Sequence, residues 1–410
     1  MTKLTCRSCG TELKHTLLDL GETPLANSYV DLQKADASDV QYPLHARVCD
    51  NCFLVQVEDV VPPEDIFSDY AYFSSYASSW VEHAKHYADN VVQRFGLSPS
   101  SFVVEVASND GYLLQHFVNK DIRVLGIEPA ANVAEEARKK SVPTEVAFFG
   151  KETAERIQSE HGPADLMAAN NVLAHVPDIN DFVTGFTTLL SDNGVVSFEF
   201  PSLLNLIENV QFDTIYHEHF SYLSLFSIEK CFNRNGLRVF DVEELSTHGG
   251  SYRVWACKQA SSRQETESLE SVREKETQAK LDCIAGYENF EPRVEKLRDE
   301  LKVFLYQAKA DGKKVIGYGA AAKGNTLLNY CGIESDLISH VADLNPHKQN
   351  TLLPGSRIPV IAPSEITTLK PDYILILPWN LKAEISSSLS YVREWGCQFV
   401  IPVPTTEVLS

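Results

Sequence analysis

The chain has 410 residues, more than one ordinary hydrophobic core supports, so we expect two or three domains. Its hydrophobic content of 44% and charged content of 22% are typical of a soluble globular protein. The formal net charge of −20, with no stripe rich in lysine or arginine, argues against a nucleic-acid partner. The N-terminal sequence lacks the apolar segment of a signal peptide, and no apolar stretch is long enough to cross a bilayer. A cytoplasmic enzyme that binds neither nucleic acid nor membrane is the first expectation.

Four cysteines near the N-terminus form two Cys-x-x-Cys pairs, Cys6 with Cys9 and Cys49 with Cys52. Two thiolates on one tight turn can reach the same tetrahedral ion, so the two pairs predict a closed structural zinc site. A redox-active dithiol is the rival interpretation. The long interval between the pairs predicts a small module, residues 1–70, that folds around them. The remaining cysteines stand singly and are predicted to be buried apolar side chains: Cys231, Cys257, Cys283, Cys331 and Cys397.

From residue 102 the chain alternates strand and helix patterns, which predicts a doubly wound α/β domain. A strand over 101–107 leads into the turn 108–111, and a helix is expected to open at Tyr112. Gly111 lets a ligand approach the backbone, and the helix N-terminus offers free amide donors. Glu128, after the second strand, suits two ribose hydroxyls. The turn has one glycine instead of the three of a dinucleotide fingerprint, which favours a methyl donor over NAD.

Later strands are expected over 144–149, 164–169 and 194–200, and two more over 237–242 and 252–257 complete a seven-stranded sheet. Loops at the carboxyl ends of such strands converge on one ligand crevice. Phe149 is placed to flank an adenine, and the fourth strand ends in a polar loop that contains His175. The candidate donor-binding residues are Glu105, Ser108, Asn109, Gly111, Glu128, Phe149, Asn170 and Asn171.

The run Tyr216, His217, Glu218 and His219 is the densest group of titratable side chains in the chain. Side chains that exchange protons near neutral pH are suited to general acid–base work. The run follows the predicted donor domain, where an acceptor would be activated. A polar loop with one structural histidine is the plain alternative. If the run is extended as a strand, His217 and His219 share a face and the choice of base between them stays open.

The C-terminal part predicts a second α/β domain after a helical segment, 264–311. A strand passes into Gly317-x-Gly319-x-x-Ala322 before a helix, which is a dinucleotide-type fingerprint. Asp343, after the next strand, stands where a ribose partner belongs. Taken alone, this region indicates NAD and a dehydrogenase.

Taken together, the motifs resemble the zinc-containing nucleotide-deoxysugar C-methyltransferases, the type that methylates carbon 3 of thymidine-diphosphate-linked sugars. The resemblance extends from the first cysteine pair to the last strands. It rests on the two cysteine pairs, 105–111 (EVASNDG), 170–176 (NNVLAHV), 216–219 (YHEH) and 247–250 (THGG). It implies an α/β protein with an N-terminal zinc-binding module (1–70), a central seven-stranded Rossmann-like methyltransferase domain (71–262) and a C-terminal helix plus second Rossmann-like domain (263–410). The implied cofactors are S-adenosylmethionine and structural Zn²⁺.

The resemblance also implies a reaction and a set of residues. The family removes a proton beside the ketone of a nucleotide-linked 4-keto sugar and delivers the methyl group to that carbon. His219 is expected to be the base, with Tyr216 as helper or alternative and Glu218 orienting it. His175 would donate to the enolate oxygen, and Tyr72 matches a functional tyrosine. The expected substrate-binding residues are Tyr76, His248, Gly249, Lys323 and Asn380.

Three other interpretations stay open at this point. An O- or N-methyltransferase acting on a related sugar would need a base but no ketone. An NAD-dependent oxidoreductase would use the C-terminal fingerprint. A zinc-ribbon binding protein with degenerate α/β domains would need none of the titratable residues at 216–219. The nucleotide, the other sugar substituents and the oligomeric state, monomer or dimer, are not predicted.

Overall fold

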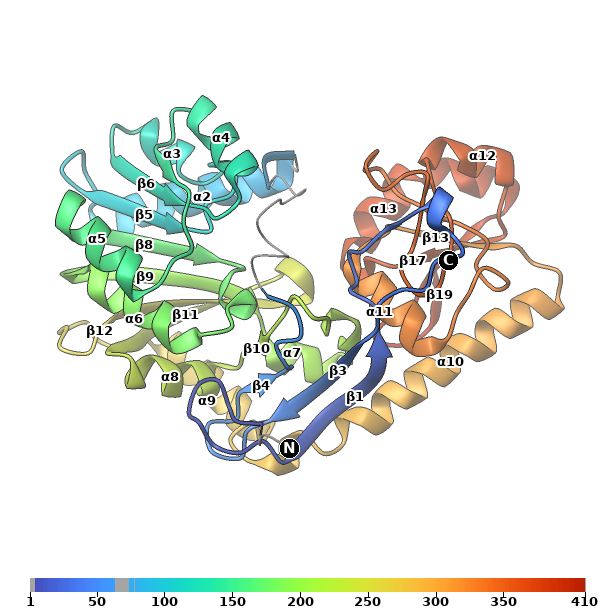
Figure 1. Ribbon diagram of the computed structural model, residues 1–410, viewed down its shortest axis with the longest axis horizontal. Coiled ribbons are helices and arrows are strands. Elements are labelled where there is room, and N and C mark those ends of the chain that lie inside the picture. The colour runs from blue at the N-terminus through green and yellow to red at the C-terminus, as the bar shows by residue number, and fades with distance from the viewer. Residues whose placement is uncertain (1–3, 63–73, 77, 410) are drawn as a thin grey trace. The chain divides into compact units, whose positions relative to one another are not determined.

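The computed structural model describes residues 4–62, 74–76 and 78–409, and the chain divides into two compact units (Figure 1). Unit 1 consists of Met1–Lys14, Cys49–Ser202 and Phe220–Cys283. Unit 2 consists of His15–Val48, Leu203–His219 and Ile284–Ser410. The chain therefore passes between the two units several times. Among the described helices, none combines the length and the apolar character that a membrane span requires.

Unit 1 contains a seven-stranded sheet in the order β11-β12-β9-β8-β5-β6-β7, as the sequence predicted. The strands from β9 to β7 are parallel, and β12 runs antiparallel to both of its neighbours. This arrangement brings the carboxyl ends of β5, β6 and β8 to one edge of the sheet. The strands are β5 (Phe102–Val106), β6 (Arg123–Ile127), β7 (Thr144–Glu145), β8 (Ala164–Asn170), β9 (Leu190–Pro201), β11 (Leu237–Leu245) and β12 (Ser251–Lys258).

Helices cover both faces of this sheet. Strand β5 shows why, because every one of its side chains is buried: Phe102 and Val104 join one apolar cluster and Val103 joins another. The first cluster includes side chains of α5, α6, α8 and α9, and the second includes side chains of α2, α3 and α4. The helices are α2 (Ser78–Phe95), α3 (Gln115–Val118), α4 (Ala131–Lys139), α5 (Lys151–His161), α6 (Ile179–Leu189), α8 (Leu225–Arg234) and α9 (Glu267–Gln278).

The two cysteine pairs of unit 1 pack on the same side of the sheet as α8. Cys6, Cys49 and Cys52 belong to the apolar cluster that contains α6 and α8. The short strand β4 (Val55–Gln56), which follows the second pair, forms an antiparallel ladder with β10 (Ser221–Tyr222). The cysteine module is therefore part of the core of unit 1.

Unit 2 begins with the long strand β1 (His15–Thr23), which lies antiparallel to β3 (Tyr42–Val48) (Figure 1). In the chain segment that connects β1 to β3, the short strand β2 (Val30–Asp31) pairs with β15 (Thr351–Leu352). The N-terminal segment 15–48 is thereby tied to the C-terminal part of the chain.

The C-terminal part of unit 2 is a second Rossmann-like sheet in the order β16-β14-β13-β17-β18-β19. All of its strands are parallel except β19, which is antiparallel to β18. This confirms the second α/β domain. The strands are β13 (Val315–Tyr318), β14 (Val341–Ala342), β16 (Val360–Ile361), β17 (Tyr373–Ile376), β18 (Gln398–Ile401) and β19 (Glu407–Leu409). The α-helices of unit 2 are α7 (Leu203–Glu208), α10 (Phe290–Ala310), α11 (Ala322–Cys331), α12 (Ile366–Leu369) and α13 (Lys382–Ser388).

Several local predictions were wrong. The helix expected over 264–311 is two helices, α9 and α10, because Lys280 takes a left-handed conformation with φ of 60° and ends the first helical run. The third strand is only β7, and Phe149 lies beyond it in irregular structure. The helix expected to open at Tyr112 begins at Gln115, after further turn residues. Cys283 is exposed, whereas the other single cysteines are buried.

Candidate active-site residues and zinc centre

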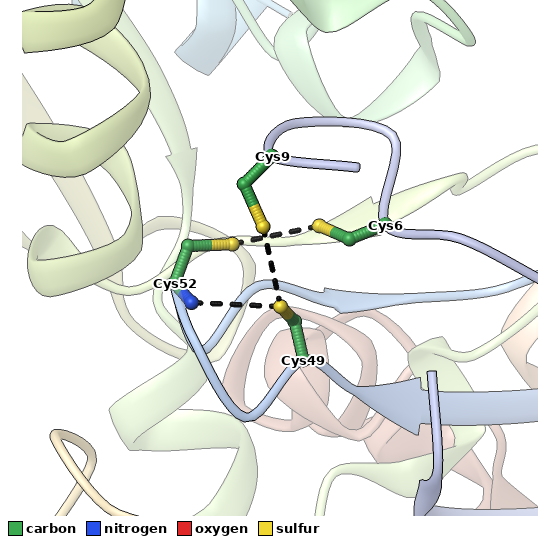
Figure 2. A group of neighbouring side chains, drawn as sticks. All are labelled: Cys6, Cys9, Cys49 and Cys52. Carbon is green, nitrogen blue, oxygen red and sulfur yellow. Dashed lines mark hydrogen bonds between the residues drawn. The ribbon is translucent and has the colours of Figure 1, made fainter. Parts of the chain in front are cut away.

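The four cysteine sulfur atoms of unit 1 lie within 4.8 Å of one another and point toward one another (Figure 2). Sγ of Cys6 is 3.5 Å from Sγ of Cys52, and Sγ of Cys9 is 3.4 Å from Sγ of Cys49. Tetrahedral zinc with bonds of about 2.3 Å separates its sulfur ligands by roughly 3.8 Å. The cysteine cluster therefore fits a closed Cys₄ zinc site.

The two cysteine turns have the same backbone design. Gly10 N donates to Cys6 O (2.8 Å), and Phe53 N donates to Cys49 O (3.0 Å) at the matching position. Gly10 and Phe53 both have positive φ, 75° and 58°, which closes each turn. Amide N–H groups also point at sulfur: Cys52 N lies 3.5 Å from Cys49 Sγ. Backbone donors of this kind stabilise thiolates, the ligand form that zinc requires.

The turn 108–111 of unit 1 is fixed by unusual backbone angles and by Glu128. Asn109 has φ of 49° and Gly111 has φ of 75°. A Cβ on Gly111 would lie 3.0 Å from Cγ2 of Val142, a tight contact that adds to the preference for glycine. Asn109 N and Ala130 N donate to the two carboxylate oxygens of Glu128, each at 2.9 Å. Burial raises the pKa of Glu128, and these two backbone hydrogen bonds oppose the rise.

Glu105, on β5 beside this turn, is a buried carboxylate that makes no hydrogen bond of good geometry among the described residues. Burial raises its pKa well above the usual range, the charges of Glu128 and Asp110 add to the rise, and the Tyr112 hydroxyl opposes it. Three other buried polar atoms at this sheet edge also lack hydrogen-bond partners in the described structure: Ser108 Oγ, Asn170 Oδ1 and Asn171 Oδ1. Buried polar groups are rarely left unpaired. A bound ligand with a sulfonium and an ammonium group would compensate the Glu105 carboxylate, so these residues fit S-adenosylmethionine.

Trp80 connects Tyr112, the residue after the turn 108–111, with His248 through ring contacts. The ring of Trp80 stacks on Tyr112 at 6.3 Å and contacts His248 edge-on at 5.6 Å. Tyr112 accepts a hydrogen bond from Asn170 Nδ2 at 3.4 Å. His248 has φ of 54°, and Gly249 follows it in η5 (Thr247–Gly249). The predicted substrate residues His248 and Gly249 therefore lie in unit 1 with the predicted donor-binding residues.

Two other predicted residues of unit 1 have different surroundings. Phe149 packs edge-on against Phe182 and Phe186, with ring centroids 5.7 and 4.8 Å apart. His175 ends the short helix η3 (Leu173–His175), in the segment that leaves β8. Tyr72 lies outside the described residues, and only the backbone of Tyr76 is described, in η2 (Ser74–Tyr76).

The run 216–219 belongs to unit 2 and forms a turn, because His219 N donates to Tyr216 O at 2.9 Å. This turn separates the two histidines. Tyr216 and His219 lie side by side, with ring centroids 4.1 Å apart. His217 is only 3% exposed and contacts the Tyr42 ring. Burial lowers the pKa of His217, and the nearby backbone of Tyr42 and Pro43 opposes this.

Both ring nitrogens of His219 have partners, and these partners fix its tautomer. Nδ1 is 3.0 Å from Thr214 O, a carbonyl that can only accept. Nδ1 of the neutral ring therefore carries the proton. Nε2, 2.9 Å from the Tyr216 hydroxyl, is then the unprotonated nitrogen and accepts from the phenol. The neutral His219 ring therefore presents the lone pair of Nε2 to the Tyr216 hydroxyl.

Glu218 interacts with Asn27 and Lys348. Its Oε1 accepts from Asn27 Nδ2 at 2.6 Å. Burial raises the pKa of Glu218, whereas the Asn27 hydrogen bond and the charge of Lys348 lower it. Lys348 also donates to Ala320 O at 2.6 Å, at the glycine turn of the C-terminal fingerprint. Lys348, which acts on Glu218 through its charge, is therefore also bound to that turn.

Lys323 and Asn380 lie together next to the same sheet. Lys323 Nζ donates to Asn380 Oδ1 at 2.6 Å and lies over the Trp379 ring at 4.5 Å. Trp379 Nε1 donates to Asp213 Oδ2 at 2.7 Å. Burial lowers the pKa of Lys323 and raises that of Asp213 to about 6, and the charge of each group opposes the shift of the other.

The fingerprint turn itself is already occupied by side chains of unit 2. Ala320 N, one of the turn amides, donates to Asp343 Oδ2 at 2.7 Å. Ala320 O accepts from Tyr29 Oη at 2.5 Å as well as from Lys348. In a dinucleotide site the turn amides would face a pyrophosphate and the acidic residue would bind a ribose. Here Asp343 and this amide bind each other.

The comparisons with known proteins agree with this architecture. Three family models match: a "Putative zinc binding domain" over residues 6–67, a "Methyltransferase domain" over 80–242 and a "C-methyltransferase C-terminal domain" over 246–404. The C-methyltransferase NovU of Streptomyces niveus is 36% identical over 405 residues, which cover 99% of this chain and 96% of NovU.

Solved structures resemble part of the chain. Magnesium protoporphyrin IX methyltransferase (ChlM) from Synechocystis PCC 6803, solved with bound SAM, has 14% identity and a TM-score of 0.37. It covers 50% of this chain and 100% of its own. The CcbJ methyltransferase from Streptomyces caelestis has 12% identity and a TM-score of 0.34, with 43% of this chain and 90% of its own covered.

The fold of unit 1, its cysteine cluster and the three family models define an S-adenosylmethionine-dependent methyltransferase with a structural zinc site. The match to NovU extends over nearly the whole of both chains. The chain therefore belongs to the zinc-containing C-methyltransferases, the family that its motifs resemble.

Sequence reasoning missed several residues that shape these sites. Thr214 acts through a backbone carbonyl, which leaves no signal in the sequence. Asn27 lies in an irregular segment 191 residues from Glu218, so no local motif connects them. Trp80, on the first turn of α2, is the one with a usable signal, since a tryptophan beside a polar helix start is unusual.

Proposed function

We propose that this enzyme methylates a carbon of a nucleotide-linked 4-keto-deoxysugar, at carbon 3, by deprotonation beside the ketone. The observation that carries the proposal is the pair formed by Tyr216 and His219, in which Thr214 O holds His219 with Nε2 unprotonated. A proton beside a ketone is far too weakly acidic to leave without a positioned base. Membership of a family of C-methyltransferases supports transfer of the methyl group to carbon. The same membership sets aside an O- or N-methyltransferase.

His219 takes the proton in this proposal, either directly through Nε2 or through the Tyr216 hydroxyl. The protonated imidazole keeps its Nδ1 hydrogen bond to Thr214 O, so the ring need not move. The half-buried carboxylate of Glu218, when ionised, supplies negative charge near the run and helps to stabilise the imidazolium. His175 donates to the enolate oxygen. Tyr72 takes part in catalysis and Tyr76 binds the sugar, and both roles are assigned from the family's motif alone because these side chains lie outside the described structure. S-adenosylmethionine supplies the electrophilic methyl group that the sugar carbon attacks.

Binding of the two substrates is assigned to separate residue sets. Glu105, Ser108, Asn109 and the other residues of the donor turn hold the methyl donor, together with Glu128, Phe149, Asn170 and Asn171. On the acceptor, His248 and Gly249 contact the sugar, while Lys323 and Asn380 hold the nucleotide. The buried ammonium of Lys323, which Asn380 fixes in place, is suited to a phosphate.

We propose the functional division 1–70 for the zinc-binding module, 71–262 for the methyl-donor domain and 263–410 for the C-terminal domain. The enzyme is expected to work in the cytoplasm on a small-molecule nucleotide sugar. An NAD-dependent oxidoreductase is disfavoured by the fingerprint turn, because Asp343 binds Ala320 N and Tyr29 donates to Ala320 O.

The test incubates the protein with S-adenosylmethionine and thymidine- or cytidine-linked 4-keto sugars in deuterium oxide. Mass spectrometry follows methyl gain and deuterium exchange together. We expect methylation on carbon, with both signals lost in His219→Asn and retained in His347→Asn, an exposed histidine of the same unit. Methylation on oxygen or nitrogen, or full activity of His219→Asn, would overturn the proposal. A change in nicotinamide absorbance during turnover would favour the oxidoreductase instead.

A further inference from the structure

Arg7 lies between the zinc ligands Cys6 and Cys9, yet its side chain turns away from the sulfur atoms. Only 10% of that side chain is exposed. Nη1 donates to Pro177 O at 3.0 Å, and Nη2 donates to Val57 O at 2.6 Å and to Asp59 Oδ1 at 2.6 Å. One guanidinium therefore binds both the segment just after β4 and the loop that leaves β8.

The backbone of the same turn also accepts hydrogen bonds from residues of α6 and α8. Asn180, at the start of α6, donates through Nδ2 to Arg7 O and to Ser8 O, each at 3.0 Å. Arg234, at the end of α8, donates to Ser8 O at 2.9 Å. Asn235 Nδ2 donates to Asn180 Oδ1 at 2.9 Å, which fixes the Asn180 amide. The first cysteine turn is thus bound at both of its middle residues by the methyltransferase domain.

These contacts reach the segment 171–178, which connects β8 to α6 and contains His175. At its start, Asn171 N donates to Glu199 O at 2.7 Å. At its end, Pro177 O is bound by Arg7. The first anchor is part of the sheet, whereas the second is a side chain on the cysteine turn. Zinc bonds to Cys6 and Cys9 would fix the backbone on both sides of Arg7, while burial and three hydrogen bonds hold its guanidinium.

We propose that the zinc centre positions segment 171–178 through Arg7, so that this arginine is a positioning residue for the methyl-donor site. The importance of the segment rests on the proposed function, which places Asn171 at the donor and His175 at the enolate. Zinc then does more than stabilise the N-terminal module. It sets the geometry of the loop at the carboxyl end of β8, although no zinc ligand is near the reacting atoms.

The experiment compares full-length Arg7→Met, Arg7→Lys and Asn180→Leu with wild type and with Arg156→Met. Arg156 is an exposed arginine of the same unit paired with Glu145. Zinc content is measured first, and amide hydrogen exchange is then followed in peptides from 171–178 and from β5. S-adenosylmethionine affinity is measured on the same samples.

We expect Arg7→Met and Asn180→Leu to keep one zinc per chain, like wild type. Exchange in 171–178 should accelerate by about tenfold, the scale of one or two lost hydrogen bonds, with β5 unchanged. Affinity for S-adenosylmethionine should fall by a similar factor. Arg7→Lys should recover part of both effects, and Arg156→Met should match wild type.

Unchanged exchange in 171–178 with zinc retained would overturn the inference. So would acceleration throughout the chain, because it would make Arg7 a general stabilising residue. The measurements of hydrogen exchange and of S-adenosylmethionine affinity do not need the sugar. If 4-keto sugars are not methylated but the exchange result holds, the proposed function fails and the positioning of the loop stands.

Discussion

The phenol of Tyr216 and the imidazole of His219 form a pair whose hydrogen-bond direction is fixed by a third group, the carbonyl of Thr214. Because Thr214 O can only accept from Nδ1, Nε2 is the nitrogen that accepts from the Tyr216 hydroxyl. A turn, with His219 N donating to Tyr216 O, brings the two rings together. The pair therefore has one proton donor and one base in fixed relative positions.

This pair predicts different effects for its two members. His219→Asn removes the base and should lower kcat by about 10²–10⁴-fold, the usual contribution of a positioned general base. Tyr216→Phe leaves the imidazole in place and should cost less, about tenfold. Steady-state kinetics with a 4-keto sugar nucleotide measure both. A smaller loss in Tyr216→Phe would indicate direct transfer to His219 Nε2, whereas equal losses would mean that the proton passes to His219 through the Tyr216 hydroxyl.

Zinc removal should destabilise unit 1, because the cysteine cluster packs with α6 and α8 and is followed by β4, which pairs with β10. Cys49→Ser should release the metal and lower the melting temperature. Cys283→Ser, at an exposed cysteine away from the cluster, should change neither. Metal analysis and thermal unfolding test this. A Cys49→Ser variant that melts like wild type would show that zinc has no structural part.

Gly319 and Gly332 provide a matched test of the fingerprint turn. Both have positive φ, 88° and 59°. A Cβ on Gly319 would lie 2.4 Å from Cδ of Pro378, whereas one on Gly332 would meet nothing within 4 Å. Gly332→Ala should therefore lower the free energy of unfolding by about 1 kcal/mol, through backbone strain alone. Gly319→Ala should cost clearly more, about 2–4 kcal/mol, since overpacking adds to the strain. Urea unfolding compares the two variants, and equal costs would contradict the close approach to Pro378.

Asp213 should make the stability of the protein pH-dependent. Burial raises its pKa to about 6 from an ordinary value of 3.8, so the folded state binds its proton more tightly than the unfolded state. This contribution to stability is fully present below the ordinary pKa and is lost as the pH rises through about 6. Asp213→Asn keeps an acceptor for Trp379 Nε1 and removes the titration. Relative to this variant, wild type should lose stability between pH 4 and 7 in urea unfolding. A constant difference over that range would exclude Asp213 as the source.

The sequence was informative wherever a local pattern determines the structure. The spacing of Cys6 and Cys9 predicted a closed cluster, and β-branched runs predicted both sheets. It failed where a single backbone angle decides, as at Lys280, whose left-handed conformation ends α9 inside a run of polar, helix-compatible residues. It also could not predict the partners of the run 216–219. Thr214 contributes a carbonyl that every residue has, and Asn27 comes from a distant segment.

The contact between Glu218 and its neighbours predicts a shift in the pH profile of activity. Lys348 lowers the pKa of Glu218 through its charge, and burial raises it. Lys348→Met removes the cation and should raise that pKa, so Glu218 would become protonated at a higher pH. If its carboxylate must be ionised to stabilise the His219 imidazolium, the acid limb of kcat should move to higher pH in Lys348→Met.

Lys313→Met is the matched control for this shift, because Lys313 pairs with Asp372 at the surface of the same unit. Its acid limb should coincide with that of wild type. Glu218→Gln cannot ionise, so it should lower kcat at every pH and show no limb from this group. Measuring kcat against pH for the three variants separates the possibilities. An acid limb that stays in place in Lys348→Met would mean that ionisation of Glu218 does not control the reaction. The hydrogen bond from Asn27 to Glu218 would then serve to hold the turn 216–219.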